Sequence, residues 1–365
     1  MKPQLGILLN LGDSFKTYRQ SGRDIHWFNN YLKYYLPAFG RPFVFSYDDE
    51  PNPFPKYIQL FVNKTGLPRF IYTFLIPFIY FKQLKSCQVL RVKQILGIWP
   101  GIIAKILWPT ILVSTYGYDY TYFAKKEDHH LIPPFIKLTE YFGLKFSDRV
   151  IVTNPEMYDK VSRIIPKNKL VLLPNGVDTA LFKPQKKKPG KYLEIISVGR
   201  LVYQKNFEAV IKAVSQVKTQ RPIRLTIVGN GRLEEKLKAL AKDLSVNLRI
   251  IPSLPHDQVA KLLQSGDIFI MASLHEGSPK ALLEAMACGL SCVVADKPYS
   301  QFIISNNKDG LLVENTILGL TQGIQSLIDQ PEKAKNISLQ ARQTVLHRFN
   351  NQTIIKKEIS LLRSL

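Results

Sequence analysis

The amino-acid sequence predicts an α/β protein made of two domains, each with a parallel sheet between layers of helices. The chain has 365 residues, more than the roughly 100–200 of an ordinary domain, so two domains are expected. From residue 191 on, apolar β-rich runs alternate with helical stretches, which is typical of βαβ repetition. The hydrophobic fraction of 45% and the charged fraction of 21% are those of globular proteins and exclude a disordered or fibrous chain.

The second half of the chain contains segments that we predict as strands of one parallel sheet. In chain order they are EIISVG, RLTIVG, LRIIPS, DIFIMAS and SCVVAD. Between the first two, apolar residues recur at a spacing of three to four, which predicts an amphipathic helix packed on the sheet. These residues are Phe207, Val210, Ile211, Val214 and Val217. The next helix, LEEKLKALAKDL, repeats the spacing with leucines, and its acidic first turn suits the positive end of the helix dipole.

The first half has the same alternation in a less regular form. Strands are predicted at GILLN, FVFSY, VLRVKQ, TILVSTYG and RVIVTN. Helices are predicted from His26 to Tyr35 and from Trp99 to Trp108, and the apolar region 57–82 is an insertion whose shape the pattern does not define. We therefore expect this half to be a second α/β domain.

A change in composition marks the boundary between the two halves. Residues 182–191, FKPQKKKPGK, contain two prolines, a glycine and a lysine run, which predict an exposed linker rather than a phosphate-binding segment. We place the boundary near residue 185, with an N-terminal domain at 1–184 and a second domain at 185–345. Residues 346–365 predict an amphipathic helix whose apolar face packs on protein or, alternatively, lies on anionic lipid.

The chain is strongly basic, with 50 Lys and Arg against 28 Asp and Glu and a formal net charge of +22. An acidic partner is therefore expected, and nucleic acid, an anionic membrane surface and a phosphorylated small molecule are all open at this point. The cysteines form no CxxC pair and lie beside no histidine at metal-ligand spacing, which argues against disulfides and a structural zinc site. We expect a reducing, cytoplasmic setting and no metal.

Two regions are apolar enough to suggest a membrane span, but neither predicts one. Lys105, Pro100 and Pro109 interrupt the run from Ile95 to Val113. Residues 70–81 would rise only about 18 Å as a helix, short of the roughly 30 Å of a hydrocarbon core. The N-terminal residues show no secretory signal.

Region 57–105 leaves two interpretations open, peripheral contact with an anionic membrane and a buried aromatic core. Its basic residues include Lys82, Lys85, Arg91 and Lys93. Its aromatic residues include Phe70, Tyr72, Phe74, Phe78, Tyr80, Phe81 and Trp99.

The segment with the clearest chemistry is HEGSPKALLEAMACGL, residues 275–290, directly after the predicted strand DIFIMAS. Ser278 is a good N-cap, Pro279 suits the first helical position and Gly289 can end the helix. A helix from Pro279 to Cys288 is therefore predicted. Its first N–H groups would lie at the carboxyl ends of the strands, where open parallel sheets bind phosphate or sugar oxygens.

Two carboxylates in this segment can face one ligand at different depths, Glu276 in the loop and Glu284 in the helix, with seven residues between them. This E-x7-E spacing within GSPKALLEAMACG resembles the signature of retaining GT-B glycosyltransferases of glycosyltransferase family 4, the glycosyl transferases group 1. Similar segments are LPNGVD at 173–178, SVGRLVYQKN at 197–206 and VGNG at 228–231. The resemblance covers about residues 147–350, and the N-terminal domain only in outline.

The resemblance implies the GT-B architecture, in which two Rossmann-like domains with parallel sheets face each other across a cleft. The N-terminal domain would bind the acceptor and the second domain the nucleotide sugar. The C-terminal helix at 346–365 would pack back on the N-terminal domain.

The resemblance also implies roles for single residues. Arg200 and Lys205 would hold the donor diphosphate, and such fixed cations stabilise the charge that grows on the leaving group, so no metal is required. Glu276 would contact hydroxyls of the transferred sugar. Glu284 would accept hydrogen bonds from the ribose, because a carboxylate offers two acceptor oxygens to a vicinal diol. The backbone between them would approach sugar and phosphate at Gly277, Ser278, Pro279, Lys280, Ala281 and Leu282.

The N-terminal domain departs from the family pattern. NLGDSF has only Gly12 where relatives have paired glycines, although Gly12 still permits a close backbone approach. TYGYD resembles the segment that lies against the transferred sugar, which makes Tyr116 and Asp119 candidates on the acceptor side and Asp119 a candidate catalytic residue. A structural cap is the equal alternative for Asp119. In the second domain, Gln301 stands where relatives often have Glu.

We therefore expect a retaining, metal-independent hexosyltransferase that moves a sugar from a UDP- or GDP-sugar to a saccharide or lipid-linked acceptor in cell-envelope or exopolysaccharide biosynthesis. No cofactor beyond this donor substrate is implied. The setting would be cytoplasmic, with peripheral contact at the inner face of the plasma membrane as an option. The resemblance implies front-face attack, in which the leaving phosphate takes the acceptor proton.

Two other functions are weighed against this one. A nucleotide-sugar epimerase of similar architecture would need no acceptor. A basic nucleic-acid-binding protein would explain the charge, but RRM, helix-turn-helix and zinc-finger signatures are missing from the sequence. A dehydrogenase is disfavoured because SVGRL and IVGNG lack the GxGxxG turn.

Overall fold

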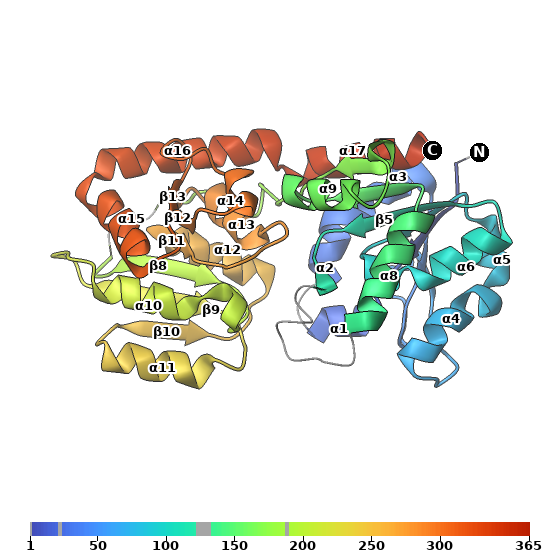
Figure 1. Ribbon diagram of the computed structural model, residues 1–365, viewed down its shortest axis with the longest axis horizontal. Helices are drawn as coiled ribbons and strands as arrows, with labels where there is room; N and C mark the ends of the chain where they lie inside the picture. The colour runs from blue at the N-terminus through green and yellow to red at the C-terminus, as the bar shows by residue number, and fades with distance from the viewer. Residues whose placement is uncertain (1, 21–23, 122–132, 187–189) are drawn as a thin grey trace. The chain divides into compact units, whose positions relative to one another are not determined.

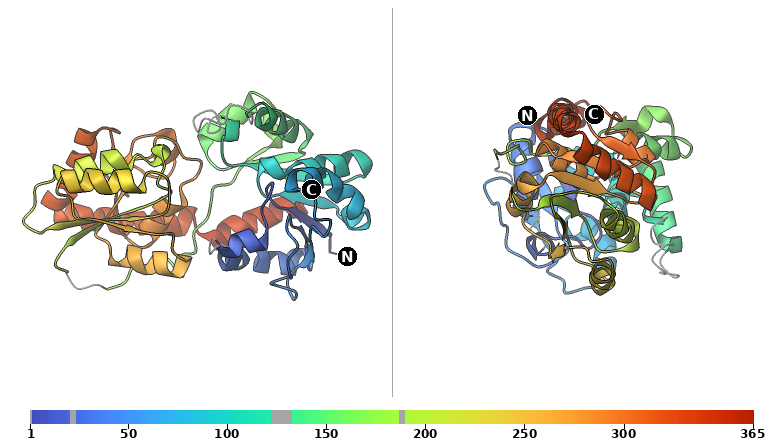
Figure 2. Two further views of the ribbon diagram at one scale, coloured as in Figure 1. Left: turned by 90° about the horizontal axis from the view of Figure 1, so that it is seen from below. Right: turned by 90° about the vertical axis from the view of Figure 1, so that its left-hand side faces the viewer.

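The computed structural model describes residues 2–20, 24–121, 133–186 and 190–365 (Figure 1). The chain divides into two compact units: unit 1 is Met1–Pro174 with Ile354–Leu365, and unit 2 is Asn175–Thr353. Each unit is an α/β fold with helices on both faces of one parallel sheet, as Figure 2 shows for each by itself. Among the described residues, no helix combines the length and the apolarity that crossing a bilayer requires.

Unit 1 is built on a parallel sheet of seven described strands in the order β3-β2-β1-β4-β5-β6-β7. They are β1 (Leu5–Leu8), β2 (Phe43–Phe45), β3 (Gln59–Phe61), β4 (Val89–Val92), β5 (Ile111–Tyr116), β6 (Arg149–Val152) and β7 (Leu170–Leu172). The central strands β1 and β4 are buried along their whole length, because helices cover both faces of the sheet, and they therefore appear in the sequence as nearly unbroken apolar runs. The edge strands β3 and β7 were not predicted, since three residues are too few to show a period.

The helices of unit 1 are shorter pieces than the sequence pattern predicted. They are α1 (Phe15–Gln20), α2 (Asp24–Trp27), α3 (Lys33–Phe39), α4 (Arg69–Ile79), α5 (Phe81–Ser86), α6 (Trp99–Leu107), α8 (Pro133–Phe146) and α9 (Pro155–Ser162). A π-helix, Phe28–Leu32, joins α2 to α3, so the helix predicted at 26–35 is three consecutive pieces. In the widened turn, the Asn30 side-chain amide donates to the His26 carbonyl over 2.9 Å. The undefined insertion contains β3, α4 and the start of α5.

Unit 2 contains a parallel sheet of six strands in its described residues, in the order β10-β9-β8-β11-β12-β13. They are β8 (Leu193–Val198), β9 (Ile223–Val228), β10 (Leu248–Ile251), β11 (Ile268–Met271), β12 (Ser291–Ala295) and β13 (Leu311–Val313). The helices are α10 (Phe207–Ser215), α11 (Glu234–Asp243), α12 (His256–Ser265), α13 (Lys280–Ala287), α14 (Pro298–Gln301), α15 (Ile317–Asp329) and α16 (Pro331–Arg348). The strands predicted here are all present, and the short edge strand β13 is an addition.

The chain enters unit 2 after Pro174, whereas the composition placed the boundary near residue 185. The reason is packing, because Val177 and Phe182 are buried in the core of unit 2. The Val177 N–H donates to the Phe349 carbonyl (2.9 Å), and the Asn351 N–H donates to the Val177 carbonyl (3.0 Å). Of the predicted linker, residues 187–189 lie outside the described residues.

The C-terminal helix α17 (Asn351–Arg363) carries the chain back into unit 1, to which residues 354–365 belong. Ile354, Ile355 and Leu362 are buried there among the side chains of β1, α2 and α3. Lys356 and Lys357 are exposed on the opposite face. The apolar face of α17 is therefore buried in the protein. It is not available to lie on anionic lipid, which was the alternative interpretation.

A buried ion pair joins α17 to the central strand β4. Arg91 Nε lies 2.7 Å from Glu358 Oε1, and the two side chains are 5% and 4% exposed. Tyr35 donates to the same oxygen over 3.0 Å. Burial alone would raise the pKa of Glu358, but the Arg91 and Lys93 charges and both hydrogen bonds outweigh it and hold the pKa below its usual value. Its place in region 57–105 had suggested that Arg91 belongs to a basic surface. Arg91 is instead a core residue.

Replacing Glu358 with Ala should lower the free energy of unfolding by about 3–5 kcal/mol, because Arg91 would stay buried without its counter-charge. Urea unfolding followed by circular dichroism measures this loss. Lys357→Ala, on the exposed face of the same helix, is the matched control and should change it by less than about 0.5 kcal/mol. A Glu358→Ala loss no larger than that of the control would show that the pair does not hold α17.

Candidate functional site

The segment with the two glutamates follows β11, a buried central strand of unit 2, and leads into α13. The helix begins at Lys280 with Pro279 as N-cap, one residue later than predicted, and Pro279 offers no side-chain cap. Ser278 is therefore not the N-cap. Its hydroxyl accepts from the Asn175 N–H (3.3 Å), while the Asn175 side-chain amide donates to the Ser278 carbonyl (2.9 Å). The helix ends at Ala287, one residue before the predicted Cys288, and Gly289 ends it as predicted, with a left-handed φ of 75°.

Asn175 belongs to the LPNGVD segment, for which the sequence indicated no chemical role. Besides fixing the loop at Ser278, this segment packs closely on the end of unit 2. A Cβ on Gly176 would lie 2.6 Å from the Asn351 Cα, so a larger residue cannot occupy this position without a backbone shift. The segment therefore acts as the support of the loop between β11 and α13.

Lys205 and Glu276 form an ion pair between the turns that follow the neighbouring strands β8 and β11. The Lys205 Nζ contacts the Glu276 Oε1, and the side chains are 16% and 10% exposed. Gln204 reinforces the contact, since its side-chain amide donates to the His275 carbonyl (2.6 Å) and its backbone carbonyl accepts from the Leu274 N–H (2.9 Å). The predicted phosphate ligand and the predicted sugar ligand are thus direct neighbours.

Arg200 is exposed at the end of β8, and within the described part of the chain no ion pair joins it to Glu276. The turn that carries it is tightly packed. Gly229 has a φ of 151°, and a Cβ there would lie 1.9 Å from the Gly199 carbonyl oxygen. Only glycine fits this contact, which explains the VGNG segment as the packing partner of the turn at Arg200.

Glu284 lies deeper than Glu276, on α13, where its side chain is 7% exposed. Its Oε1 is 3.5 Å from Nδ1 of His256, the first residue of α12. Burial raises the pKa of Glu284 to about 7, although Lys280 opposes the shift. Burial, together with Lys280, lowers the pKa of His256 to about 4, so the imidazole is neutral at pH 7 and the contact is not a salt bridge. A carboxyl group that titrates near neutrality therefore faces a neutral histidine.

His256 is a residue that the sequence did not single out. It starts a helix 28 positions before Glu284, and neither spacing nor a motif connects the two. The backbone between the glutamates adds the first N–H groups of α13, which lack acceptors within the helix. The side chain of Leu282 is buried in the core, so this residue can offer only its backbone to a ligand.

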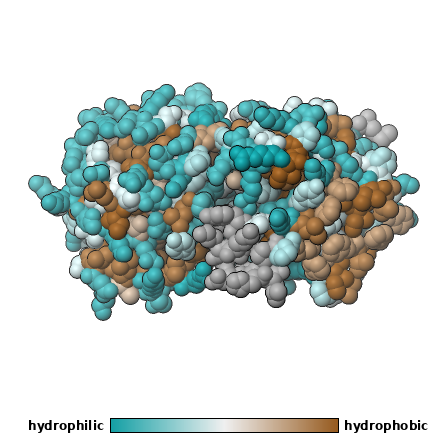
Figure 3. Space-filling model, in the orientation of Figure 1, coloured by the Kyte–Doolittle hydropathy of each residue, from teal (hydrophilic) through white to brown (hydrophobic). Residues whose placement is uncertain are grey.

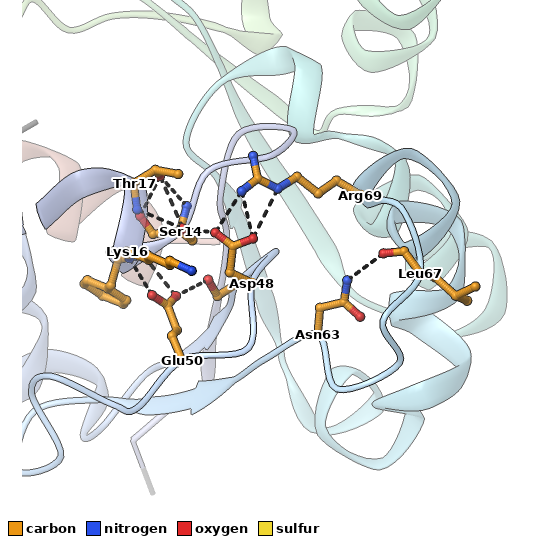
Figure 4. Close-up of polar contacts among 10 residues, drawn as sticks. Ser14, Lys16, Thr17, Asp48, Glu50, Asn63, Leu67 and Arg69 are labelled. Atoms are coloured by element: carbon orange, nitrogen blue, oxygen red, sulfur yellow. Dashed lines mark hydrogen bonds and ion pairs between the residues drawn. The ribbon is translucent and has the colours of Figure 1, made fainter. Parts of the chain in front are cut away.

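Gly12 lies in unit 1, in the turn after β1, where the Asp13 N–H donates to the Asn10 carbonyl (2.9 Å) and Gly12 has a left-handed φ of 79°. Figure 4 shows how two carboxylates from the loop after β2 hold the following residues. Asp48 accepts from the Ser14 hydroxyl (2.6 Å) and from Arg69 (2.7 Å). Glu50 accepts from the backbone N–H groups of Phe15 (2.9 Å) and Lys16.

Glu50 thus accepts from the first two N–H groups of the short helix α1, and the Ser14 hydroxyl accepts from the third, that of Thr17 (3.0 Å), so these N–H groups are used inside unit 1. The sequence did not reveal the two carboxylates because they are 34 or more residues distant from the turn. The single glycine of NLGDSF therefore sits in a loop whose shape is fixed by ion pairs and hydrogen bonds rather than by a second glycine.

Tyr116 and Asp119 lie at and after the carboxyl end of β5. Tyr116 is buried, and burial followed by the Glu140 charge raises the pKa of its phenol. Asp119 forms an ion pair with Lys160 of α9. Asp119 thus links the loop to a helix, and the structure brings it together with Tyr116 and Lys160, whose Nζ lies 5.7 Å from the Tyr116 ring centre.

Gln301, at the end of α14, donates to Asp296 over 2.8 Å.

Within the described residues, no group of three or more His, Cys, Asp and Glu side chains could hold a metal ion. The candidate residues of unit 2 therefore offer two cations, two carboxylates and backbone N–H groups at one edge of one sheet, a set suited to phosphate and sugar hydroxyls.

Known proteins resemble this chain in sequence and in structure. Residues 178–344 match the family model described as Glycosyl transferases group 1. WcaL of Escherichia coli K12, provisionally named a colanic acid biosynthesis glycosyltransferase, is 34% identical over 213 residues, which are 55% of this chain and 52% of WcaL. The match thus spans about half of that relative's length.

A second relative matches over more of the chain. The Escherichia coli UDP-Gal:alpha-D-GlcNAc-diphosphoundecaprenol alpha-1,3-galactosyltransferase is 28% identical over 275 residues, 70% of this chain and 69% of that protein. Among solved structures, Anabaena HepE in complex with UDP and glucose has a TM-score of 0.78 at 16% identity and covers 99% of this chain and 100% of its own. The structural neighbours are GT-B glycosyltransferases, and the fold is therefore GT-B.

The raised pKa of Glu284 predicts a pH-dependent stability. A carboxyl group whose pKa is about 7 in the folded chain and 4.5 in the unfolded chain holds more protons when folded, so stability falls as pH rises between these values. Glu284→Gln removes this titration and should be more stable than the parent by about 3 kcal/mol at pH 8, but not at pH 4. Urea unfolding at both pH values measures the difference.

Glu332→Gln, on an exposed position of α16, is the control and should leave the pH profile unchanged. An equal effect of Glu284→Gln at pH 4 and pH 8 would contradict the assignment of a buried, titrating carboxyl group.

Proposed function

We propose that this chain, whose residues 178–344 match the Glycosyl transferases group 1 model, is a retaining hexosyltransferase that uses a nucleotide-diphosphate sugar as donor and no metal. The observation that carries the proposal is the Lys205–Glu276 ion pair, which joins the turn after β8 to the E-x7-E segment after β11. Lys205 would bind phosphate and Glu276 would bind sugar hydroxyls. The two side chains are in contact, and the sugar and the diphosphate of the donor are likewise directly bonded.

In the proposed reaction, Arg200 and Lys205 bind the donor diphosphate. Negative charge grows on this group as its bond to the sugar C1 breaks, and fixed cations stabilise that charge more in the transition state than before it. Lys205 would exchange Glu276 for a phosphate oxygen, which leaves the Glu276 carboxylate to accept from sugar hydroxyls. The N–H groups at the start of α13 would add to phosphate binding.

Retention would follow from attack on the face that the diphosphate leaves. The acceptor oxygen bonds to C1, the C1–O bond to phosphate breaks, and the acceptor proton passes to the departing phosphate oxygen. Retaining hydrolases instead place two carboxyl groups about 5 Å apart around the bond. Glu276 is held by Lys205 and Glu284 is buried against His256, so neither is arranged as the second member of such a pair.

The comparisons support a donor and an acceptor class without defining either. HepE was solved with UDP and glucose, and the galactosyltransferase relative is named for a UDP-sugar donor and a diphosphoundecaprenol-linked acceptor. We accordingly propose a UDP- or GDP-sugar donor and a saccharide or lipid-linked acceptor, within cell-envelope or exopolysaccharide biosynthesis in the cytoplasm. Gly12, Tyr116 and Asp119 of unit 1 are the proposed acceptor-side residues, with Asp119 positioned by Lys160. The excess of cations serves phosphate-bearing ligands rather than nucleic acid.

A panel of UDP-, GDP-, ADP- and CDP-sugars tests the donor site by thermal unfolding, with and without EDTA. A ligand at a hundredfold above Kd adds about 2.7 kcal/mol to stability, which is a clear melting shift. Sugars of one nucleotide class should raise the melting temperature, and EDTA should not change this shift. Glu284→Gln retains the fold and should lose the shift. A shift that EDTA abolishes would refute the metal-free site, and a full shift in Glu284→Gln would refute the ribose contact.

Arg200→Ala and Lys205→Ala should each lower kcat by about 10²–10³, the usual cost of losing one group that stabilises transition-state charge. Sugar transfer to an acceptor, with the anomeric configuration of the product read by NMR, is the measurement. Lys261→Ala, an exposed lysine of α12, is the control and should keep full activity. Conversion of the donor sugar without any acceptor would instead indicate an epimerase.

A further inference from the structure

One face of unit 1 is unusually apolar. Of the sixteen large hydrophobic side chains that are exposed among the described residues, ten lie on or beside α4, α5, α6 and α8. Figure 3 shows this apolar surface over α4, α5 and α6. Its members are Leu67, Phe70, Ile71, Phe78, Ile79, Phe81, Ile106, Leu107, Leu138 and Tyr141, and we call them the apolar face. Contiguous exposed apolar surfaces of this kind mark interaction sites in proteins that are otherwise polar outside.

The apolar face is the outer surface of one continuous layer of helices. Phe74 of α4 lies 5.5 Å from the ring of Trp99 in α6, and the Trp99 ring lies 6.1 Å from Phe142 in α8. The Trp99 indole also donates to the Thr139 hydroxyl of α8 over 3.0 Å. On the inner side, Tyr72 is fully buried. The aromatic residues of region 57–105 are therefore divided between the core and the surface, where Phe78 is 59% exposed.

The charge of this surface is of one sign. The sequence from residue 51 to residue 118 contains eight Lys and Arg and no Asp or Glu. Arg91 is buried with Glu358 and Lys105 pairs with Asp148, but Lys64, Lys82 and Lys85 are exposed beside the apolar face. Helix α8 adds the exposed Lys137 and Lys145, while its only acid, Glu140, is buried.

We propose that the apolar face and its lysines are a docking surface for an anionic lipid bilayer. Aromatic and aliphatic side chains would enter the boundary between headgroups and acyl chains, and the surrounding lysines would contact lipid phosphates. A bilayer supplies both an apolar phase and negative charge over an extended area. A second copy of the same face would supply apolar surface but no negative charge, because its lysines would oppose lysines.

This inference goes beyond the proposed function and does not rest on it. The docking surface belongs entirely to unit 1, whereas Arg200, Lys205, Glu276 and Glu284 belong to unit 2. Lipid binding and donor binding can therefore be measured separately, and either can fail without the other.

The experiment is flotation of the whole chain with vesicles of phosphatidylcholine alone or mixed with phosphatidylglycerol. Binding should require phosphatidylglycerol and weaken at high salt. A basic residue near an anionic leaflet is worth roughly a fivefold change in partition, so Lys82→Glu/Lys85→Glu should lower binding at least roughly thirtyfold. Phe78→Ser/Phe81→Ser should lower binding at low and high salt alike, since it removes apolar insertion rather than charge.

Matched controls come from α16 of unit 2. Lys335→Glu and Leu339→Ser are exposed substitutions of the same kinds and should leave flotation unchanged. A far-UV circular dichroism spectrum and a melting temperature equal to those of the parent show that each unit 1 variant is folded.

Three results would overturn the proposal. One is an unmodified chain that does not float with phosphatidylglycerol vesicles. Another is a loss of flotation in the α16 controls that equals the loss in the unit 1 variants. The third is self-association, seen by light scattering, that Phe78→Ser/Phe81→Ser abolishes while vesicle binding stays unchanged, which would assign the face to a second copy.

Discussion

Parallel pairing of neighbouring strands is the constraint on which the candidate site depends. Because β8, β9, β11 and β12 all run in one direction, their carboxyl ends and the turns that follow them gather at one edge of the sheet. Lys205 and Glu276 are 71 residues apart along the chain, yet the adjacency of β8 and β11 makes them an ion pair. Close packing at the same edge requires glycine at position 229, where the chain touches the turn of Arg200. The chemistry of unit 2 is therefore a consequence of strand order.

Two of the buried glutamates, Glu358 and Glu284, differ in how their charge is compensated. Glu358 has a guanidinium and a phenol as partners, so its pKa stays low and the pair holds a terminal helix on the core. Glu284 faces a neutral imidazole, and its pKa rises to about 7. Burial of an uncompensated carboxyl group opposes folding, and such sites are often functional. The contrast separates a structural carboxylate from a proposed ligand-binding one on physical grounds.

Unit 1 has a polar edge and an apolar flank. At the carboxyl edge of its sheet, Asp48 and Glu50 hold the turn after β1, and Lys160 holds Asp119. On the flank, helices α4, α6 and α8 share an aromatic core and present apolar side chains among lysines. Helices that pack on a sheet normally place such residues inward only. A proposed acceptor carrying a lipid would suit both features, a polar edge for the sugar and an apolar flank for the bilayer.

The sequence by itself determined the alternation of strands and helices, the two α/β units and the segment at 275–290. The reason is that the hydrophobic period and the capping of a helix depend on residues close together in the sequence. Through the resemblance it also predicted Arg200, Lys205, Glu276 and Glu284 as site residues. Only the tertiary structure decided that Ser278 binds Asn175 instead of capping α13, that His256 faces Glu284, and that Arg91 is buried with Glu358. These contacts join residues 28 to 267 positions apart, where no local period exists and only the packing of whole elements sets the distance.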